Sequence, residues 1–349
     1  MSVSCIDLFC GVGGLTHGFV KEGLPVAAGI DLDAACRYPY EQNNNTIFVE
    51  RDVSQVGPDD LDKFFGDAKV KVLAGCAPCQ PFSTYSQRYD LNRNERWGLL
   101  YEFARLAEGT RPNVITMENV PSVQKHEVFH DFVAELEKFG YHVWYSVVDS
   151  SHFGVPQTRK RMVLLASRHG PIKMIDRTHA KPKTVRQAIG RLEPIPAGGS
   201  SNSDGLHVAA TLSELNMRRI KASKPGGSWR DWPQELVAKC HREGTGKTYP
   251  SVYGRMEWDK PAPTMTTQCY GFGNGRFGHP EQDRAISLRE AAVIQGFPKN
   301  YKFLEKGSRI EFRTLGRMIG NAVPVGLGQA IAKSIKEHLQ SQDFKSQAS

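Results

Sequence analysis

The sequence lacks any apolar run close to the roughly 20 residues that a helix needs to cross a bilayer. It also lacks a basic amino-terminal segment followed by an apolar stretch, because residues 3–9 already read as a short strand. Neither a membrane span nor a secretory leader is therefore expected. These absences predict an intracellular, cytoplasmic protein that does not associate with membranes.

Cysteine is scarce, with seven residues scattered through a chain of 349. An odd, dispersed set argues for reduced thiols rather than for a disulfide framework. Cys76 and Cys79 form a Cys-x-x-Cys pair, but no second pair follows that could complete a zinc site. A redox pair of this spacing normally opens a helix, whereas Cys79 stands in a Pro-Cys-Gln turn. We expect no bound metal.

Basic residues clearly outnumber acidic ones in the middle of the chain. The formal net charge is +8, and residues 171–260 hold 16 Lys or Arg against nine Asp or Glu. Nearly all of the excess positive charge therefore lies in this one segment. A phosphate-facing surface fits that distribution, and a solvated basic face is the alternative.

The first half of the chain alternates strand-like and helix-like segments, which predicts an α/β fold with a parallel-type sheet covered on both faces. Helical spacing occurs at residues 14–22, at 34–43 and after Pro121. Ligands of such sheets bind beyond the carboxyl ends of the strands. The expected strands are residues 5–9, 25–30, 46–49, 70–74, 113–117, 142–148 and 162–166.

After residue 170 the composition changes to Pro, Gly, Ser and basic residues without this alternation. We predict a second, smaller and irregular domain over residues 171–283. Residues 1–170 and 284–349 together would form the larger domain, with helices at 288–295 and 327–339.

A glycine-rich loop, Phe9–Gly14, joins the first strand to the first helix, so that its backbone can turn tightly and approach a ligand. Asp31 ends the second expected strand, where an acid commonly binds ribose hydroxyls. Asp52 ends the third-strand region and could meet an adenine amino group. The loop lacks the full GxGxxG spacing, so a plain packing turn is the alternative.

Five ordered segments carry a family resemblance: Asp7–Gly14, Gly75–Ser83, Glu118–Val120, Gln157–Arg161 and Gly320–Pro324. In this order they resemble the motif set of DNA (cytosine-5) methyltransferases of the bacterial restriction–modification type, over residues 5–336. The resemblance implies a Rossmann-like S-adenosylmethionine-dependent methyltransferase sheet with a smaller target-recognition domain. It also implies methyl transfer to carbon-5 of a flipped-out cytosine in a short sequence of double-stranded DNA.

The resemblance implies that Phe9 lies against the adenine of S-adenosylmethionine and that Asn321 closes the pocket over its methionine part. S-adenosylhomocysteine would be the product. The cofactor residues implied are Phe9, Gly11, Gly13, Gly14, Asp31, Leu32, Asp52, Val53, Pro78, Asn321 and Ala322.

The expected catalytic groups are Cys79, Glu118, Arg159 and Arg161. Carbon-5 of cytosine is a poor nucleophile until a thiolate adds to carbon-6, and cysteine is both nucleophilic and a competent leaving group. A carboxyl group at Glu118 would stabilise the charge that builds on the ring nitrogen. The two arginines are the candidate cations that favour the thiolate.

DNA contacts are expected from Ser83, Gln87, Arg93 and Gln157, the first three within a polar loop at residues 82–97. Aromatic residues between Trp229 and Phe272 interleave with basic ones, which suits nucleic acid and the core of a small domain equally well.

One departure from the family pattern is visible. The family usually has Gly-Gly-x-Pro-Cys, and here Cys76 takes the place of the second glycine and is followed by Ala77. A tRNA-methylating enzyme ranks second, since its Cys-Phe-Thr tripeptide is absent. A zinc deaminase and a non-catalytic DNA-binding regulator rank lower. We expect a monomer in the bacterial nucleoid, with a cognate restriction endonuclease as a plausible separate partner.

Overall fold

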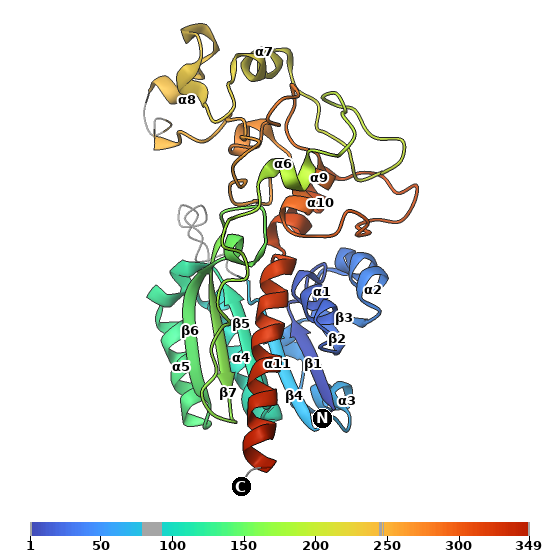
Figure 1. Ribbon diagram of the computed structural model, residues 1–349, viewed down its shortest axis with the longest axis vertical. Helices are drawn as coiled ribbons and strands as arrows, with labels where there is room; N and C mark the ends of the chain where they lie inside the picture. The colour runs from blue at the N-terminus through green and yellow to red at the C-terminus, as the bar shows by residue number, and fades with distance from the viewer. Residues whose placement is uncertain (1, 79–92, 244–245, 247, 348–349) are drawn as a thin grey trace. The chain divides into compact units, whose positions relative to one another are not determined.

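A seven-stranded sheet lies at the centre of the larger of two structural units in this computed structural model (Figure 1). Its order is β3-β2-β1-β4-β5-β7-β6. Every strand runs in one direction except β7, which is antiparallel to both of its neighbours. The strands are β1 (Val3–Leu8), β2 (Val26–Asp31), β3 (Ile47–Glu50), β4 (Val70–Gly75), β5 (Val114–Asn119), β6 (His142–Asp149) and β7 (Lys160–Ser167).

The structure describes residues 2–78, 93–243, 246 and 248–347, with side chains omitted for 93–97 and 342–347. The first unit comprises residues 1–153, 160–178 and 323–349, and the second comprises 154–159 and 179–322. In the described ranges, no helix combines the length and the apolar character that crossing a membrane requires.

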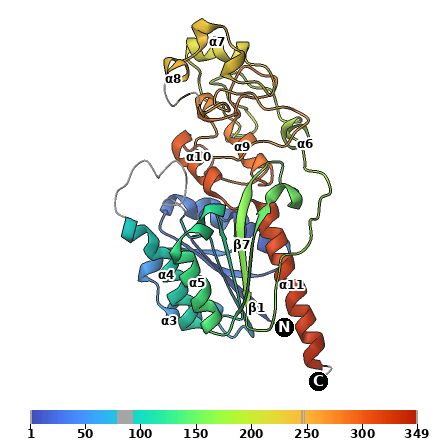
Figure 2. The same cartoon turned by 90° about the vertical axis from the view of Figure 1, so that its left-hand side faces the viewer.

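Helices pack on both faces of the sheet because side chains alternate between the faces along each strand. Cys5 and Val72 face one apolar cluster, whereas Ile6 and Leu73 face the other. Figure 2 shows α11 on one side and α3, α4 and α5 on the opposite side. The helices of this unit are α1 (Gly14–Lys21), α2 (Arg37–Asn44), α3 (Pro58–Phe65), α4 (Arg93–Thr110), α5 (Glu127–Lys138) and α11 (Val325–Gln347).

Glycines allow α1 and α11 to lie in close contact. A Cβ atom on Gly18 would lie 2.6 Å from the backbone nitrogen of Gln329, and one on Gly328 would lie 3.1 Å from the carbonyl oxygen of Leu15. Neither backbone can give way without moving a whole helix. The long carboxyl-terminal helix is therefore fixed against the helix that follows the glycine-rich loop.

The second unit consists of short helices, turns and isolated bridges. The sequence left open whether its aromatic residues contact nucleic acid or form a small core. Trp229, Trp232 and Phe272 form a buried cluster, whereas Tyr249 is 43% exposed. A buried ion pair joins Arg284 to Glu290 through two hydrogen bonds of 2.7 and 2.8 Å. The helices are α6 (Val185–Ile189), α7 (Glu214–Ala222), α8 (Lys239–Arg242), α9 (Leu288–Ile294) and α10 (Phe312–Asn321).

The expected α/β class is confirmed, and the structure adds detail that the apolar pattern did not contain. The reversed direction of β7 was not predicted; it arises because β7 follows β6 through a short connection and inserts between β5 and β6. Helices α3, α4 and α10 were also not predicted. The polar loop expected at residues 82–97 ends earlier, because the backbone of residues 93–97 is helical and forms the start of α4.

Candidate active site

The carboxyl ends of β1, β4 and β5 meet at one edge of the sheet. Leu8 pairs with Gly75, and Gly75 pairs with Met117, so the residues that follow each strand emerge side by side. The glycine-rich loop, the segment Cys76–Pro78 and the end of β5 therefore converge. This is the position at which open α/β sheets bind their ligands.

Glu118 is buried at this edge, with 3% of its side chain exposed. Its Oε2 atom accepts a hydrogen bond from the Cys76 thiol at 3.0 Å. Its Oε1 atom lies 3.0 Å from Nε of Arg161 on the adjacent strand β7, yet that N–H is not aligned to form a hydrogen bond with it. The carboxyl group is thus held by a charge and a thiol while Oε1 keeps its accepting capacity.

Asn119 fixes the loop that follows β4. Its Nδ2 donates to the carbonyl oxygen of Ala77 at 3.2 Å, and its Oδ1 accepts from the backbone of Val120 at 2.8 Å. The first of these hydrogen bonds ties the end of β5 to the segment that follows β4. Gly75 fits tightly at the same place, because a Cβ atom there would lie 2.9 Å from the Phe103 ring.

Three of the predicted functional residues, Cys79, Ser83 and Gln87, lie outside the described residues. Pro78, the last described residue before Cys79, is exposed. Arg93 is the first residue of α4, and its side chain is not among those described. The structure therefore positions the start of the loop that leads to Cys79.

The glycine-rich loop has an unusual backbone. Phe9 has a φ of 57°, in the left-handed region that non-glycine residues seldom adopt, and Gly11 and Gly13 have φ values of 51° and 83°. In the part of the chain that the structure describes, a Cβ atom on Gly11 would meet no atom within 4 Å. Gly14 begins α1, so the loop presents open backbone at the start of a helix.

Asp31 supports this loop directly. One of its oxygens accepts from the backbone N–H of Gly11 at 2.8 Å, and the other accepts from Asp33 at 2.9 Å. Burial raises the pKa of the Asp31 carboxyl above its usual range. The next residue, Leu32, is 67% exposed, which leaves an apolar side chain beside the carboxylate.

Asp52 and Val53, the other pair predicted to contact the cofactor, lie just after β3. Asp52 accepts a hydrogen bond from the backbone of Ser54 at 2.9 Å and so caps a short 3-10 helix, η2 (Val53–Gln55). Val53 is buried in the apolar cluster that also contains Leu8. A role for either residue toward adenine stays a prediction.

Asp7 is a buried acid for which no individual role was predicted. It is 2% exposed, and its Oδ2 accepts from the Thr16 hydroxyl at 2.7 Å. Burial raises the pKa of its carboxyl from 3.8 to about 7. The raised pKa of Asp7 follows from its burial, which the sequence pattern does not reveal.

Four predicted site residues belong to the second unit: Gln157, Arg159, Asn321 and Ala322. The Gln157 amide donates to the side chain of Gln295 at 2.7 Å and accepts from the backbone of Met265 at 3.0 Å. A contact to DNA by Gln157 stays a prediction and would require these bonds to exchange.

Arg159 is 3% exposed and donates to the carbonyl oxygens of Met265 at 2.8 Å and Gly320 at 3.1 Å. Asn321 ends α10 and is exposed, and Ala322 accepts a hydrogen bond from the side chain of Gln295. A Cβ atom on Gly320 would lie 2.3 Å from the backbone of Thr266. The glycine thus permits close packing within this unit.

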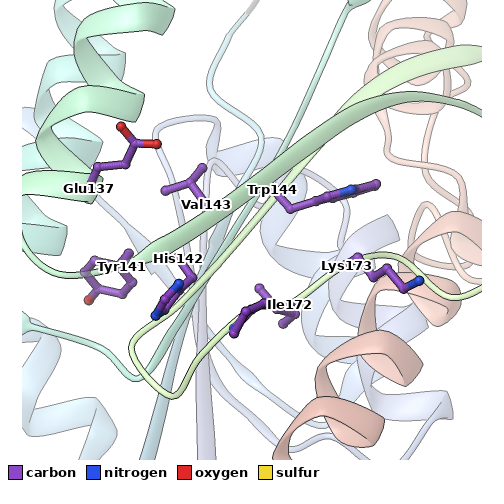
Figure 3. A pocket seen from close by; sticks show the side chains of 8 residues that line it. Glu137, Tyr141, His142, Val143, Trp144, Ile172 and Lys173 are labelled. Carbon is purple, nitrogen blue, oxygen red and sulfur yellow. The ribbon is translucent and has the colours of Figure 1, made fainter.

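A hollow of about 550 Å³ lies elsewhere, at the opposite end of the strands (Figure 3). His142 pairs with Ser167, which in turn pairs with Val114 at the start of β5. The hollow is therefore remote from Glu118. Its lining comprises Glu137, Tyr141, His142, Val143, Trp144, Pro171, Ile172 and Lys173.

Known proteins of one family match this chain over nearly its whole length. The model of the family described as C-5 cytosine-specific DNA methylase matches residues 3–337. The Type II methylase M.HgiDII of Herpetosiphon aurantiacus is 53% identical over 340 residues, which cover 96% of this chain and 95% of that protein. The chain belongs to the C-5 cytosine-specific DNA methylase family. It is a DNA cytosine-5 methyltransferase of the bacterial restriction–modification type.

Solved structures support the methyltransferase fold. A candidate DNA modification methyltransferase encoded within an E. coli prophage aligns with a TM-score of 0.74 at 21% identity and covers 97% of this chain and 100% of its own. The Entamoeba histolytica methyltransferase EhMeth aligns with a TM-score of 0.67 at 15% identity and covers 97% and 99%.

The methyltransferase family uses S-adenosylmethionine as its methyl donor. The glycine-rich loop fits this group, because open backbone at Gly11, the carboxylate of Asp31 and the exposed Leu32 suit amino, hydroxyl and apolar parts of a nucleoside. Among the residues that the structure describes, no group of three or more His, Cys, Asp or Glu could hold a metal ion.

Proposed function

We propose that this methyltransferase modifies carbon-5 of a flipped-out cytosine in a short duplex sequence through a covalent adduct between Cys79 and carbon-6. The observation that carries the proposal is the buried Glu118 carboxyl group, paired with Arg161 at the carboxyl end of β5. It lies beside the segment Cys76–Pro78, which leads directly to Cys79. A carboxyl group beside the target base and a thiolate nucleophile are the two groups that this chemistry needs.

The reaction begins when the Cys79 thiolate forms a bond to carbon-6 and the electron pair of the 5,6 double bond moves toward ring nitrogen-3. Glu118 shares a proton with that nitrogen and so limits the negative charge. Carbon-5 then becomes enamine-like and accepts a methyl group, which S-adenosylmethionine supplies. A water molecule takes the carbon-5 proton, the electron pair of that C–H bond restores the 5,6 double bond, the bond from carbon-6 to sulfur breaks to release the Cys79 thiolate, and the proton on nitrogen-3 returns to Glu118.

Arginine side chains would favour the thiolate form of Cys79. Arg161 already carries its charge at the carboxyl edge of the sheet, 3.0 Å from Glu118. Arg159 is proposed to act in the same way, from a position fixed by two backbone carbonyls. Pro78 would fix the turn before the thiol.

The proposed cofactor contacts come from the family resemblance, and the loop geometry supports part of them. Phe9 would lie against the adenine, Gly11–Gly14 would border the site, and Asp31 would bind the ribose hydroxyls. Because Asp31 already holds the Gly11 N–H, it would link ribose binding to the shape of the loop. The remaining proposed contacts are Leu32, Asp52, Val53, Pro78, Asn321 and Ala322.

The target base must leave the DNA stack, and for a paired base this costs roughly a few kcal/mol of free energy. We assign recognition of the surrounding sequence to residues 171–283 and catalysis to residues 1–170 and 284–349. Ser83, Gln87, Arg93 and Gln157 are proposed DNA contacts. The positive excess in the middle segment predicts that affinity for DNA falls steeply as salt rises.

We further propose that the enzyme acts as a cytoplasmic, nucleoid-associated monomer. A cognate restriction endonuclease would act on the same sequence as a separate protein rather than as a stable subunit. One chain supplies every residue that the proposed chemistry needs.

A duplex carrying 5-fluorocytosine at the target position tests the covalent step. Fluorine cannot leave as the carbon-5 proton does, so the adduct should persist as a protein–DNA species stable in denaturant. Cys79→Ser should form none, and Cys76→Ser should still form it. An adduct in Cys79→Ser, or an adduct with tRNA and none with duplex DNA, would overturn the proposal.

A further inference from the structure

We propose that Cys76 is a positioning residue for Glu118, and that its thiol holds the carboxyl group in the orientation that methyl transfer requires. The inference rests on the proposed role of Glu118 toward the target base. It concerns a thiol other than the nucleophile, three residues earlier in the same loop.

The contact is direct and local. Cys76 follows β4, Glu118 lies near the end of β5, and the two strands are paired neighbours. The distance from Sγ to Oε2 is 3.0 Å, and the thiol donates because a carboxylate oxygen accepts. Asn119 holds the backbone of Ala77, so the segment that carries the thiol is itself fixed.

The two oxygens of Glu118 are made unequal by this arrangement. Oε2 accepts from Cys76, whereas Oε1 lies beside the Arg161 charge and has no hydrogen-bond partner among the described residues. A buried carboxyl group with only a charge beside it could rotate about its last bond, since the ion pair sets a distance but little direction. The thiol supplies the missing direction and leaves Oε1 for the proton shared with the base.

A glycine at position 76, which the family pattern usually has, could not supply this donor. The neighbouring Gly75 has no room for a side chain, because a Cβ atom there would lie 2.9 Å from Phe103. Residue 76 is therefore the first position after β4 that can carry a side chain toward Glu118. Cys76 is partly exposed and also packs against the apolar cluster that contains Val72, so it lies at the border between the core and the site.

The test compares wild type, Cys76→Ala, Cys76→Ser and Glu118→Gln in single-turnover methyl transfer, with both substrates saturating. Loss of one weak donor to a charged group should slow Cys76→Ala by about fivefold to tenfold. Cys76→Ser should recover most of that loss, because a hydroxyl also donates. Affinity for S-adenosylmethionine and the melting temperature should stay near wild type in both variants.

The outcomes separate the two proposals. An inactive wild type, or a fully active Glu118→Gln, would remove the proposed function itself. An active wild type with an impaired Glu118→Gln, but with Cys76→Ala as fast as wild type, would overturn only the positioning role. Equal slowing of the alanine and serine variants, with weaker cofactor binding, would also overturn it by indicating a packing role.

Discussion

Arg161 and Glu118 form a nearly buried ion pair between neighbouring antiparallel strands, with Nε 3.0 Å from Oε1 and side chains 13% and 3% exposed. Paired charges can be buried where either alone would be costly. The fold thus places a carboxyl group at the edge of the sheet where cofactor and substrate are proposed to meet.

Removing the cation alone should leave Glu118 uncompensated. We expect Arg161→Met to lower the free energy of unfolding by about 3 kcal/mol. The double variant Arg161→Met, Glu118→Gln should regain at least half of that loss, because no buried charge remains. Urea unfolding of the single and double variants measures the coupling. Strictly additive losses would show that the two side chains do not stabilise each other.

We expect opposite effects on stability from two glycine substitutions, one inside the contact between α1 and α11 and one outside it. Gly18→Ala should destabilise the protein by about 1–3 kcal/mol, because its Cβ would overlap the backbone of Gln329. Gly98→Ala in α4 is the matched control, since no atom of the described residues lies within 4 Å of its Cβ position. It should stabilise by up to about 1 kcal/mol through helix propensity. Thermal unfolding compares them, and a neutral Gly18→Ala would contradict the close packing.

Asp7 should make stability depend on pH. Its pKa is raised by burial to about 7 from 3.8, so the folded state holds its proton over that range while the unfolded state has lost it. The stability that Asp7 contributes is therefore complete below pH 3.8 and is lost as pH rises to about 7.

Asp7→Asn should remove this dependence while keeping an acceptor for Thr16. Relative to wild type, the variant should gain on the order of 2–4 kcal/mol between pH 4.5 and pH 8. Urea unfolding at a series of pH values measures the difference. Asp67→Asn, at an exposed position, serves as the control. Parallel stability curves for Asp7→Asn and wild type would refute a buried, protonated Asp7.

The second unit should depend on the ion pair between Arg284 and Glu290, which are 0% and 1% exposed. Arg284→Met would leave the carboxylate buried beside His279, at a cost of about 3–5 kcal/mol. We expect faster amide hydrogen exchange in residues 279–295, with exchange in β1 and β4 unchanged. Uniformly faster exchange across the chain would instead mean that the pair stabilises both units together.

Much of the first unit could be predicted from local pattern. Short apolar runs mark β1, β2, β4 and β5, since a strand buried on both faces needs apolar residues throughout. The reversed direction of β7 had no such signal, because strand direction depends on pairing rather than on composition. The contact of Gly18 with α11 joins segments over 300 residues apart, and nothing local marks it.

The motifs predicted which residues form the candidate site, but they did not predict the contacts between those residues. The segment that contains Glu118 and Asn119 was found from the family pattern, whereas Cys76 was noted only as part of a Cys-x-x-Cys pair and as a departure from that pattern. Its contact with Glu118 required the register of β4 against β5. In the second unit, alternating aromatic and basic residues fitted two interpretations, and burial showed that Trp229 and Trp232 form a core.

The most direct test of the central claim is bisulfite sequencing of plasmid DNA from bacteria that express this chain or its Cys79→Ser variant. The account predicts cytosines protected from conversion within one short recurring sequence, and full conversion at the same sites with the variant. Full conversion with soluble, folded wild-type protein, or protection that survives Cys79→Ser, would contradict methyl transfer to DNA through Cys79.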